Sequence, residues 1–330
     1  MRALLPLLVA LGAVAGEARE YTIGMSPWIA WAPMHVAESR GIWERLGVRV
    51  RVVNHLGEQE HIAAVAGGRV DLTMEMIGSV VGLVQDGTPM TILAELDWSH
   101  GGDKLIARTT DALARGSTIG VYRDDPAILM FLSEVLRGRG LALADIVLAE
   151  YDCDALVAQF IAGRLPAIAV YDPHTLVAIR DGGGVAIASS AIPVGCMPEG
   201  LAGRQDLVAA IPRADLARII LGWMLACDWC ARDANWADYA RIVNQRTFDG
   251  AEHGEEDLRA MLSVVRLHDA ATLRERHADD GGLRGFVGAC ERLLVDNQRL
   301  VRPFTAAGMI DTAALDEALA LYDRGLGRDE

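Results

Sequence analysis

The chain has 330 residues, of which 52% are hydrophobic and 34 are glycines, so it is long enough for two folded units and does not resemble a disordered chain. Asp and Glu number 45 against 31 Lys and Arg, and the net charge of −14 argues against nucleic acid as a partner, because phosphate binding depends on a basic surface. Five cysteines in a chain of this length are too few for a disulfide scaffold.

The N-terminus has the features of an export signal. Arg2 precedes an apolar run over residues 3–15, and Ala13-Val14-Ala15 has the small-x-small pattern of a signal-peptidase site. The run is shorter than the about 20 apolar residues that a membrane span needs. We therefore predict a signal peptide over residues 1–15, cleaved near residues 15–18, and a periplasmic mature protein. An uncleaved anchor or a buried first helix is the alternative.

Short β-rich runs then alternate with helical stretches, in two sets of similar order. In the first set, strands are predicted at 21–25, 48–53, 70–74, 90–96 and 104–108, with helices at 32–46, 58–66 and 78–85. In the second set, strands are predicted at 117–121, 146–148, 167–170 and 185–188, with helices at 126–137, 153–162 and 173–179. Strands alternating with helices of this length predict parallel pairing through right-handed crossovers.

After about Leu201 the pattern becomes helical throughout. Apolar residues recur at helical spacing over residues 214–232, 236–246, 255–265, 269–276, 283–297 and 312–324. Such a tail must dock on the α/β part to bury its apolar faces. Cys227 and Cys230 have C-x-x-C spacing, but they continue a helical pattern and lack the helix N-terminus that activates redox pairs. We therefore favour core packing over a redox or metal role for them.

Four segments carry a family resemblance: S-P-W-I-A-W-A-P at 26–33, A-E-S-R-G-I-W-E-R-L-G-V at 37–48, A-G-G-R-V-D-L at 66–72 and S-H-G-G-D at 99–103. They resemble the substrate-binding component of ABC importers in the taurine, sulfonate, nitrate and thiamine-precursor group. The resemblance implies an α/β, two-lobed type 2 periplasmic-binding-protein fold, with a helical C-terminal extension packed on lobe one. Lobe one is expected to comprise 20–110 plus 201–330, and lobe two 111–200.

The same resemblance implies a function without catalysis. It implies a monomer that binds a small-molecule ligand, delivers it to an ABC transporter permease in the inner membrane and uses no cofactor or metal. The ligand is expected in the cleft between the lobes, at the carboxyl ends of the strands, as in other open α/β sheets. Closure of the lobes around the ligand is the expected motion.

The loops at the strand ends hold the candidate ligand-binding residues. These are Trp28, Trp31, Glu75, Met76, Asp97, Trp98, His100, Tyr122, Asp124, Tyr171, Asp172 and Ser190. Aromatic and acidic side chains dominate this set, although only 5% of the chain is aromatic. Aromatic faces attract cations and stack on flat rings, whereas an anion favours Arg, Lys or free backbone N–H groups. A nitrogen-containing or cationic ligand, such as a pyrimidine-like thiamine precursor, is therefore expected.

Structural roles compete with ligand binding at several of these positions. Each Trp could cap the core, and Asp124 or Asp125 could cap the helix that starts at Pro126. Glu75 is the strongest single candidate, because an acid that interrupts the apolar run 72–77 needs a partner when it is buried.

Three other functions compete with this prediction. An enzyme on the same fold is one, since certain pyrimidine synthases resemble this group, but their cysteine-rich iron motif is absent here. The sequence also has no G-x-S-x-G and no H-E-x-x-H motif. A binder of a sulfonate, taurine or nitrate-type anion is the second alternative. A ligand-sensing subunit of a membrane signalling system is the third.

Overall fold

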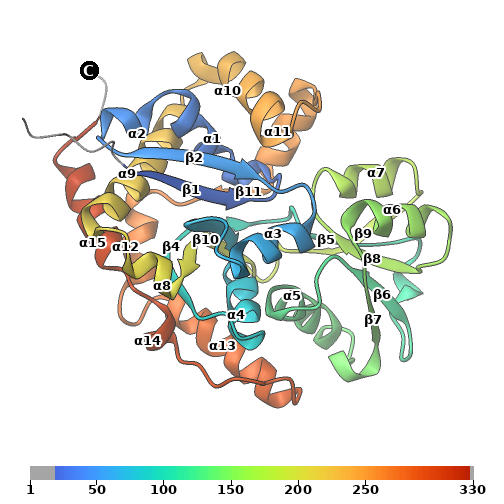
Figure 1. Ribbon diagram of the computed structural model, residues 1–330. Coiled ribbons are helices and arrows are strands. Elements are labelled where there is room, and N and C mark those ends of the chain that lie inside the picture. The colour runs from blue at the N-terminus through green and yellow to red at the C-terminus, as the bar shows by residue number, and fades with distance from the viewer. Residues whose placement is uncertain (1–18, 328–330) are drawn as a thin grey trace, which may run out of the picture.

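The computed structural model describes residues 19–327, so the predicted signal peptide lies outside the described residues. The described strands form two sheets flanked by helices, which agrees with the predicted α/β class (Figure 1). We call the larger sheet with its helices lobe one and the smaller sheet with its helices lobe two. Among the described helices, none combines the length and apolar character that crossing a membrane requires.

The sheet of lobe one has six strands in the order β11-β4-β10-β3-β1-β2. They are β1 (Glu20–Met25), β2 (Arg49–Asn54), β3 (Leu72–Met76), β4 (Met90–Ser99), β10 (Pro198–Arg204) and β11 (Val265–Leu267). The helices between its first strands are η1 (Ile29–Trp31), α1 (Ala32–Ser39), α2 (Ile42–Arg45), α3 (Glu58–Ala66) and α4 (Ile77–Gln85).

The sheet of lobe two has five strands in the order β7-β6-β8-β5-β9. They are β5 (Lys104–Ala107), β6 (Thr118–Val121), β7 (Val147–Glu150), β8 (Ala167–Val170) and β9 (Val185–Ser189). Its helices include α5 (Pro126–Arg137), α6 (Cys153–Ile161) and α7 (His174–Arg180). Asp125 is the N-cap of α5, since its Oδ1 accepts from the N–H groups of Ala127 and Ile128 at 3.0 and 3.4 Å.

Parallel pairing holds only on one side of each sheet. β1 runs parallel to β2 and β3, and β6 runs parallel to β7 and β8. β10 is antiparallel to β3 and β4, and β5 is antiparallel to β8 and β9, so the prediction of parallel pairing throughout is wrong for these strands. The reason is topological: each of these strands arrives from the other lobe and therefore enters its sheet from the edge that faces the cleft.

β10 and β11 correct the prediction of a purely helical chain after residue 201. β10 lies between β3 and β4 and is buried along nearly its whole length, yet it contains a proline and two glycines. A Cβ on Gly200 would lie 2.0 Å from the carbonyl oxygen of Ala94, so only glycine fits the close approach of the two strands. These residues suit tight packing but not the composition of an ordinary strand, which explains why the strand is hard to detect from sequence.

Two crossings connect the lobes, β4 to β5 and β9 to β10, and they are hydrogen-bonded to each other. The hydroxyl oxygens of Ser99 and Ser190 lie 2.8 Å apart, and the Gly101 N–H donates to Ser190 Oγ at 2.8 Å. The Ser190 N–H donates to the carbonyl oxygen of Asp103 at 2.9 Å. The sheet boundaries therefore fall in these crossings: β5 belongs to lobe two although it precedes residue 111, and β10 joins lobe one from residue 198.

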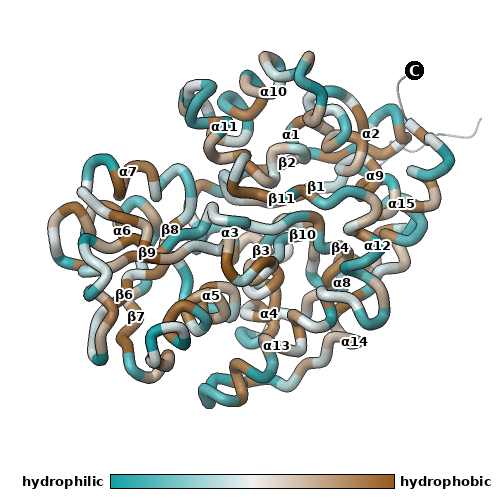
Figure 2. Tube along the Cα trace, turned by 180° about the vertical axis from the view of Figure 1, so that it is seen from behind, coloured by the Kyte–Doolittle hydropathy of each residue, from teal (hydrophilic) through white to brown (hydrophobic). Residues whose placement is uncertain are grey.

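The C-terminal helices pack mainly on lobe one, as the sequence predicts (Figure 1). They are α8 (Gln205–Ala209), α9 (Arg213–Cys230), α10 (Trp236–Ile242), α11 (Glu255–Ser263), α12 (Ala270–His277), α13 (Gly282–Asp296), α14 (Ala306–Met309) and α15 (Ala313–Asp323). The central helix of this group is α9, which contacts α1, α2 and α15 and contributes to the largest hydrophobic core. Figure 2 shows hydrophobic residues along α4, which contacts β4 and the C-terminal helix α13.

The two lobes also touch through α4 and α5. Gly78 on α4 faces Ala127 on α5 so closely that a Cβ on Gly78 would lie 2.5 Å from the backbone nitrogen and Cα of Ala127. This contact and the two crossings enclose the space between the lobes from different sides.

Candidate functional site

A small cavity lies between the lobes. Its lining comprises Ser26, Trp28, Trp31, Glu58, Glu75, Met76, Asp103, Tyr122, Tyr171 and Glu199. Most of these residues follow the carboxyl ends of β1, β2, β3, β6 and β8, and Asp103 comes from the first crossing. The position agrees with the general rule that open α/β sheets bind ligands at the carboxyl ends of their strands.

Four aromatic side chains form the walls of the cavity, two from each lobe. The Trp28 and Tyr171 rings meet edge to face with centroids 5.7 Å apart, and the Tyr122 and Tyr171 rings do so at 5.0 Å. Gly102 lies against the Trp28 ring, since a Cβ at this position would be 2.3 Å from Trp28 Cη2. The aromatic surface thus continues across the lobe boundary, as expected for a cleft that closes on a flat or cationic group.

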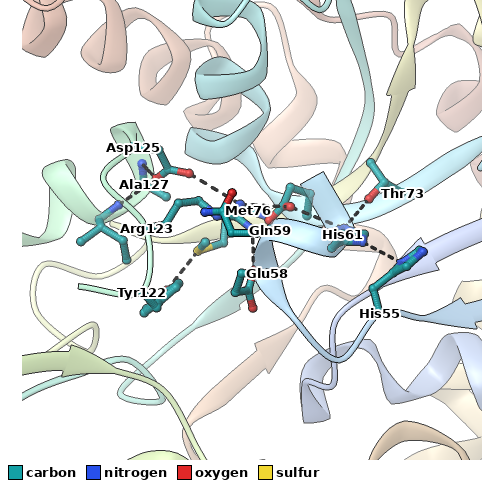
Figure 3. A network of polar contacts seen from close by, with 12 residues as sticks. His55, Glu58, Gln59, His61, Thr73, Met76, Tyr122, Arg123, Asp125 and Ala127 are labelled. Carbon is teal, nitrogen blue, oxygen red and sulfur yellow. Dashed lines mark hydrogen bonds and ion pairs between the residues drawn. The ribbon is translucent and has the colours of Figure 1, made fainter. Parts of the chain in front are cut away.

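Arg123 joins the lobes at one end of the cavity (Figure 3). Its guanidinium lies 2.5 Å from Glu58 Oε2 and 3.1 Å from Glu75 Oε2, and the three side chains are buried. Tyr171 also donates its hydroxyl to Glu58 Oε1 at 2.7 Å. The buried acid at position 75 therefore has a partner, as predicted, but this partner is a side chain from lobe two.

Burial controls the protonation of this network. Desolvation raises the pKa of Glu75 to about 7, although the Arg123 charge acts in the opposite direction. Behind Glu75, desolvation lowers the pKa of His61 to about 3, so its imidazole is neutral at physiological pH. His61 Nε2 lies 3.0 Å from Thr73 Oγ1, and its Nδ1 lies 3.1 Å from His55 Nδ1 (Figure 3).

Asp103 differs from the other acids of the cavity. Its Oδ1 accepts the Tyr122 hydroxyl at 2.7 Å, and its backbone N–H donates to Ser99 Oγ at 3.1 Å. No lysine or arginine of the described chain lies within ion-pair distance of its carboxyl group. Burial raises the pKa of Asp103, with these hydrogen bonds and Lys104 opposing the shift. The neighbouring Lys104 instead lies 3.1 Å from Asp172 Oδ2.

Half of the residues predicted from the sequence line the cavity. These are Trp28, Trp31, Glu75, Met76, Tyr122 and Tyr171. Four of them follow a strand, whereas Glu75 and Met76 are the last two residues of β3. All six thus lie at carboxyl ends of strands, which is the geometric basis of the prediction. Whether they contact a ligand stays a prediction, since lining a cavity is a matter of position alone.

Three other predicted residues have structural partners away from the cavity lining. Asp124 is paired with Arg299 at 2.6 Å, and Asp172 with Lys104. Ser190 lies in the second crossing and bonds the first. These positions follow strands, but their side chains are turned toward neighbouring charges or hydroxyl groups.

Asp97, Trp98 and His100 belong to the end of β4 and the start of the first crossing, outside the cavity lining. Asp97 is fully buried beside Glu199 on the adjacent strand. Trp98 donates its indole N–H to Glu95 Oε1 at 2.6 Å, and the His100 N–H donates to the carbonyl oxygen of Val264 at 2.8 Å. The long β4 carries these side chains past the cavity toward the C-terminal helices.

Four lining residues were absent from the predicted set: Ser26, Glu58, Asp103 and Glu199. The first three could have been identified from the sequence, because Ser26 and Glu58 follow strand ends and Asp103 is the last residue of the S-H-G-G-D segment. Glu199 could not, because it lies on β10, a strand that the sequence pattern does not reveal. Its Oε2 accepts the indole N–H groups of both Trp28 and Trp31, at 2.7 and 2.8 Å.

The cysteines form no site in the described chain. All five thiols are free, and Cys227 and Cys230 lie at the C-terminal end of α9. Burial raises the pKa of Cys230 to about 12 and raises that of Cys227 well above its ordinary value. Among the described residues, no cluster of three or more His, Cys, Asp and Glu is placed to hold a metal ion.

Comparison with known proteins decides the family. The profile of the NMT1-like family matches residues 14–244, which is more than half of the chain and includes all the lining residues. The chain belongs to the NMT1-like family. A search of curated proteins found no match to it.

Solved structures share the fold of this NMT1-like protein at low sequence identity. The alkanesulfonate-binding protein SsuA from Xanthomonas axonopodis pv. citri has a TM-score of 0.70 at 16% identity, with 90% of this chain and 100% of that chain covered. The periplasmic nitrate-binding protein NrtA from Synechocystis PCC 6803 has 0.68 at 15%, with 92% and 89% covered.

A Candida albicans protein described as exhibiting the generic periplasmic binding protein structural fold has a TM-score of 0.66 at 12% identity, with 91% and 94% covered. These similarities confirm the two-lobed periplasmic-binding-protein fold predicted from the sequence. With the family match, they also confirm the predicted group resemblance.

Proposed function

We propose that this NMT1-like protein is an exported solute-binding protein. It captures a small organic ligand, nitrogen-containing or cationic, between its lobes and delivers it to an ABC importer. The family and the fold support the binding role, and the names of structures with the same fold include alkanesulfonate- and nitrate-binding proteins.

The residues that line the cavity are the basis for the proposed class of ligand. Four carboxyl groups and four aromatic side chains face it, and no lysine or arginine is part of the described lining. The two cations nearby are already bound, Arg123 by Glu58 and Glu75, and Lys104 by Asp172. A sulfonate or nitrate ion would meet carboxylates and find few donors, whereas a protonated amine or a ring N–H would find acceptors and aromatic faces.

We assign Asp103 as the residue that accepts a hydrogen bond from the ligand. Glu58 and Glu75 share the charge of Arg123, whereas the described partners of the Asp103 side chain are neutral. Ser26 adds a hydroxyl group that lines the cavity and is buried without a hydrogen-bond partner. A buried polar group of this kind gains stability when a ligand supplies its hydrogen bond.

The chemistry of the cavity favours binding over catalysis. The thiol of Cys153 senses the charges of two lining acids, and burial together with the charges of Glu58 and Asp103 raises its pKa well above the ordinary value. A thiol held in its protonated form is a poor nucleophile. We therefore propose that the ligand leaves the cavity unchanged.

Isothermal titration tests the proposal. Thiamine, a 4-aminopyrimidine and benzylamine serve as nitrogenous probes, and methanesulfonate, taurine and nitrate serve as anionic ones. We expect binding in the first group, weakened about 10- to 100-fold by Asp103→Asn, which corresponds to the loss of one hydrogen bond to a charged group. Asp124→Asn is the matched control, because Asp124 lies outside the cavity lining.

Binding of the anions alone, with an affinity that Asp103→Asn leaves unchanged, would overturn the proposed ligand class. In that case the anion-binding alternative suggested by the SsuA and NrtA names would stand. Conversion of any probe to a product, followed by mass spectrometry after incubation with the purified protein, would overturn the non-catalytic role.

A further inference from the structure

Glu199 and Asp97 form a buried pair of acids behind the aromatic wall of the cavity. They are direct cross-strand neighbours on β10 and β4, and their exposed fractions are 2% and 0%. No described cation lies within ion-pair distance of either side chain. Both carboxyl oxygens of Asp97 are buried, and neither receives a hydrogen bond from a donor in the described chain. If both acids were ionised, Glu199 would have no proton to donate to them.

Two ionised carboxylates cannot occupy such a place side by side. The cost of burying one uncompensated charge is several kcal/mol, and the two charges also repel each other. A single proton held between them removes the repulsion and gives Asp97 the donor that it lacks, as in other buried carboxyl pairs. The structure therefore requires that one of the two acids is neutral.

The indole contacts leave one oxygen of Glu199 available to share the proton. Glu199 Oε2 accepts two N–H groups, from Trp28 and Trp31, so this oxygen acts only as an acceptor. The other oxygen of Glu199 is left for Asp97. Burial is the largest cause that raises the pKa of both acids, and the charge of Asp97 raises that of Glu199 further. The pair accordingly holds one proton between Glu199 and Asp97 and carries a single negative charge.

We propose that Glu199 is a positioning residue that shares one proton with Asp97 while it holds the Trp28 and Trp31 indoles in the wall of the cavity. The shared proton lowers the charge of the pair from two to one, so charge recognition is left to the other lining acids. This part rests on the proposed function, whereas the arrangement of the two indoles does not depend on any ligand.

The charged and titratable groups around the pair are mostly acidic or bound elsewhere. Asp103 acts on Glu199 from the first crossing, and Glu95 acts on Asp97 from the same strand. His268 acts on Asp97, but its Nε2 is bound to Glu95 Oε1 at 3.0 Å, and Arg276 is bound to the same Glu95 at 2.7 Å. The thiol of Cys227 on α9 also senses the Asp97 charge. None of these groups supplies a counter-charge in contact with the pair.

Glu199→Gln is the decisive variant. An amide is neutral at every pH, its carbonyl oxygen can accept both indole N–H groups, and its NH₂ can donate to Asp97. We expect the near-ultraviolet circular dichroism of the tryptophans to be retained in Glu199→Gln and to stay constant from neutral to alkaline pH. In the native protein the same signal should fall when the pair loses its proton. Trp28→Phe and Trp31→Phe identify the part of the signal that comes from these indoles.

Two results would overturn the proposal. The first is a Glu199→Gln protein that misfolds or loses the signal of both indoles, because an amide of the same shape can also accept both indole N–H groups and donate to Asp97. The second is a Glu199→Gln protein that keeps the native alkaline change. Glu199→Leu, which can accept no indole N–H, is expected to lose the signal. All measurements use the protein without ligand, so they can fail or succeed independently of the proposed ligand class.

Discussion

Arg123 Nη1 lies 3.1 Å from Glu75 Oε2, and this contact joins the loop after β6 in lobe two to the end of β3 in lobe one. The carboxylate and the guanidinium are separated by 48 positions in the sequence, and both side chains are buried. Their ion pair is thus a bond between the lobes as well as a feature of the cavity.

Arg123→Met is expected to open the lobes. The substitution leaves the carboxyl groups of Glu58 and Glu75 buried without a counter-charge, which typically costs about 3–5 kcal/mol. Opening exposes both groups to water and relieves this cost. Small-angle X-ray scattering of the ligand-free protein should therefore show a larger radius of gyration.

Arg299→Met is the matched control for this change. Arg299 pairs with Asp124 of lobe two, but both side chains are partly exposed, and such pairs contribute about 0–1 kcal/mol. An equal expansion in both variants, or none in Arg123→Met, would show that the buried pair does not hold the lobes together.

Glu75→Gln should change how stability depends on pH. The folded-state pKa of Glu75 is raised from 4.5 to about 7. For a raised pKa, the contribution to stability is full below the unfolded value and is lost as the pH rises through the folded value. Between pH 4.5 and about pH 7 the native protein should therefore lose stability relative to Glu75→Gln, by on the order of 3 kcal/mol.

Urea unfolding at several pH values measures this difference. Glu60→Gln is the control, since Glu60 is exposed on α3 and should leave the pH profile unchanged. Parallel pH profiles for the native protein and Glu75→Gln would contradict the raised pKa. The comparison is between variants, so the buried histidines contribute equally to both.

Gly78→Ala should hinder closure. The new Cβ would lie 2.5 Å from backbone atoms of Ala127, and a backbone cannot move aside as a flexible side chain does. Overpacking of this kind costs about 1–3 kcal/mol. Because the clash falls on the contact between the lobes, the closed form is disfavoured. Ligand affinity should therefore fall roughly 5- to 150-fold, and the radius of gyration of the ligand-free protein should increase, as in Arg123→Met.

Gly285→Ala is the control for the effect of replacing a glycine with alanine inside a helix. Gly285 lies within α13 with no atom near the position of its Cβ, so alanine should stabilise the helix by about 0.5–1 kcal/mol and leave affinity unchanged. Native affinity in Gly78→Ala would mean that the ligand-bound protein does not bring α4 and α5 this close.

Gly102→Ala should displace Trp28. The added Cβ would be 2.3 Å from Trp28 Cη2 and 2.9 Å from Cζ2, and the rigid indole can only move as a whole. We expect a reduced near-ultraviolet tryptophan signal and a stability loss of about 1–3 kcal/mol. Gly254→Ala, at an exposed position with no atom within contact distance, should show neither effect. A native spectrum in Gly102→Ala would contradict the packing of Trp28 against the crossing.

Much of the fold could be predicted from local pattern. The two sets of alternating strands and helices, the helical tail and its docking on lobe one all follow from periodicity, which depends on residues near each other in sequence. β10 could not be predicted in this way. Its proline and glycines are unfavourable in an isolated strand, and it exists because β3 and β4 supply partners on both sides.

The family resemblance, the strand ends that face the cleft and the acidic, aromatic character of the residues placed there could all be recognised in the sequence. The partners of the buried acids became known from the three-dimensional arrangement: Glu75 pairs with Arg123, and Glu199 lies against two indoles and Asp97. The physical reason is that the state of a buried carboxyl group depends on its nearest charges and donors. Here these neighbours come from distant parts of the chain and meet only when the two crossings bring β10 back between β3 and β4.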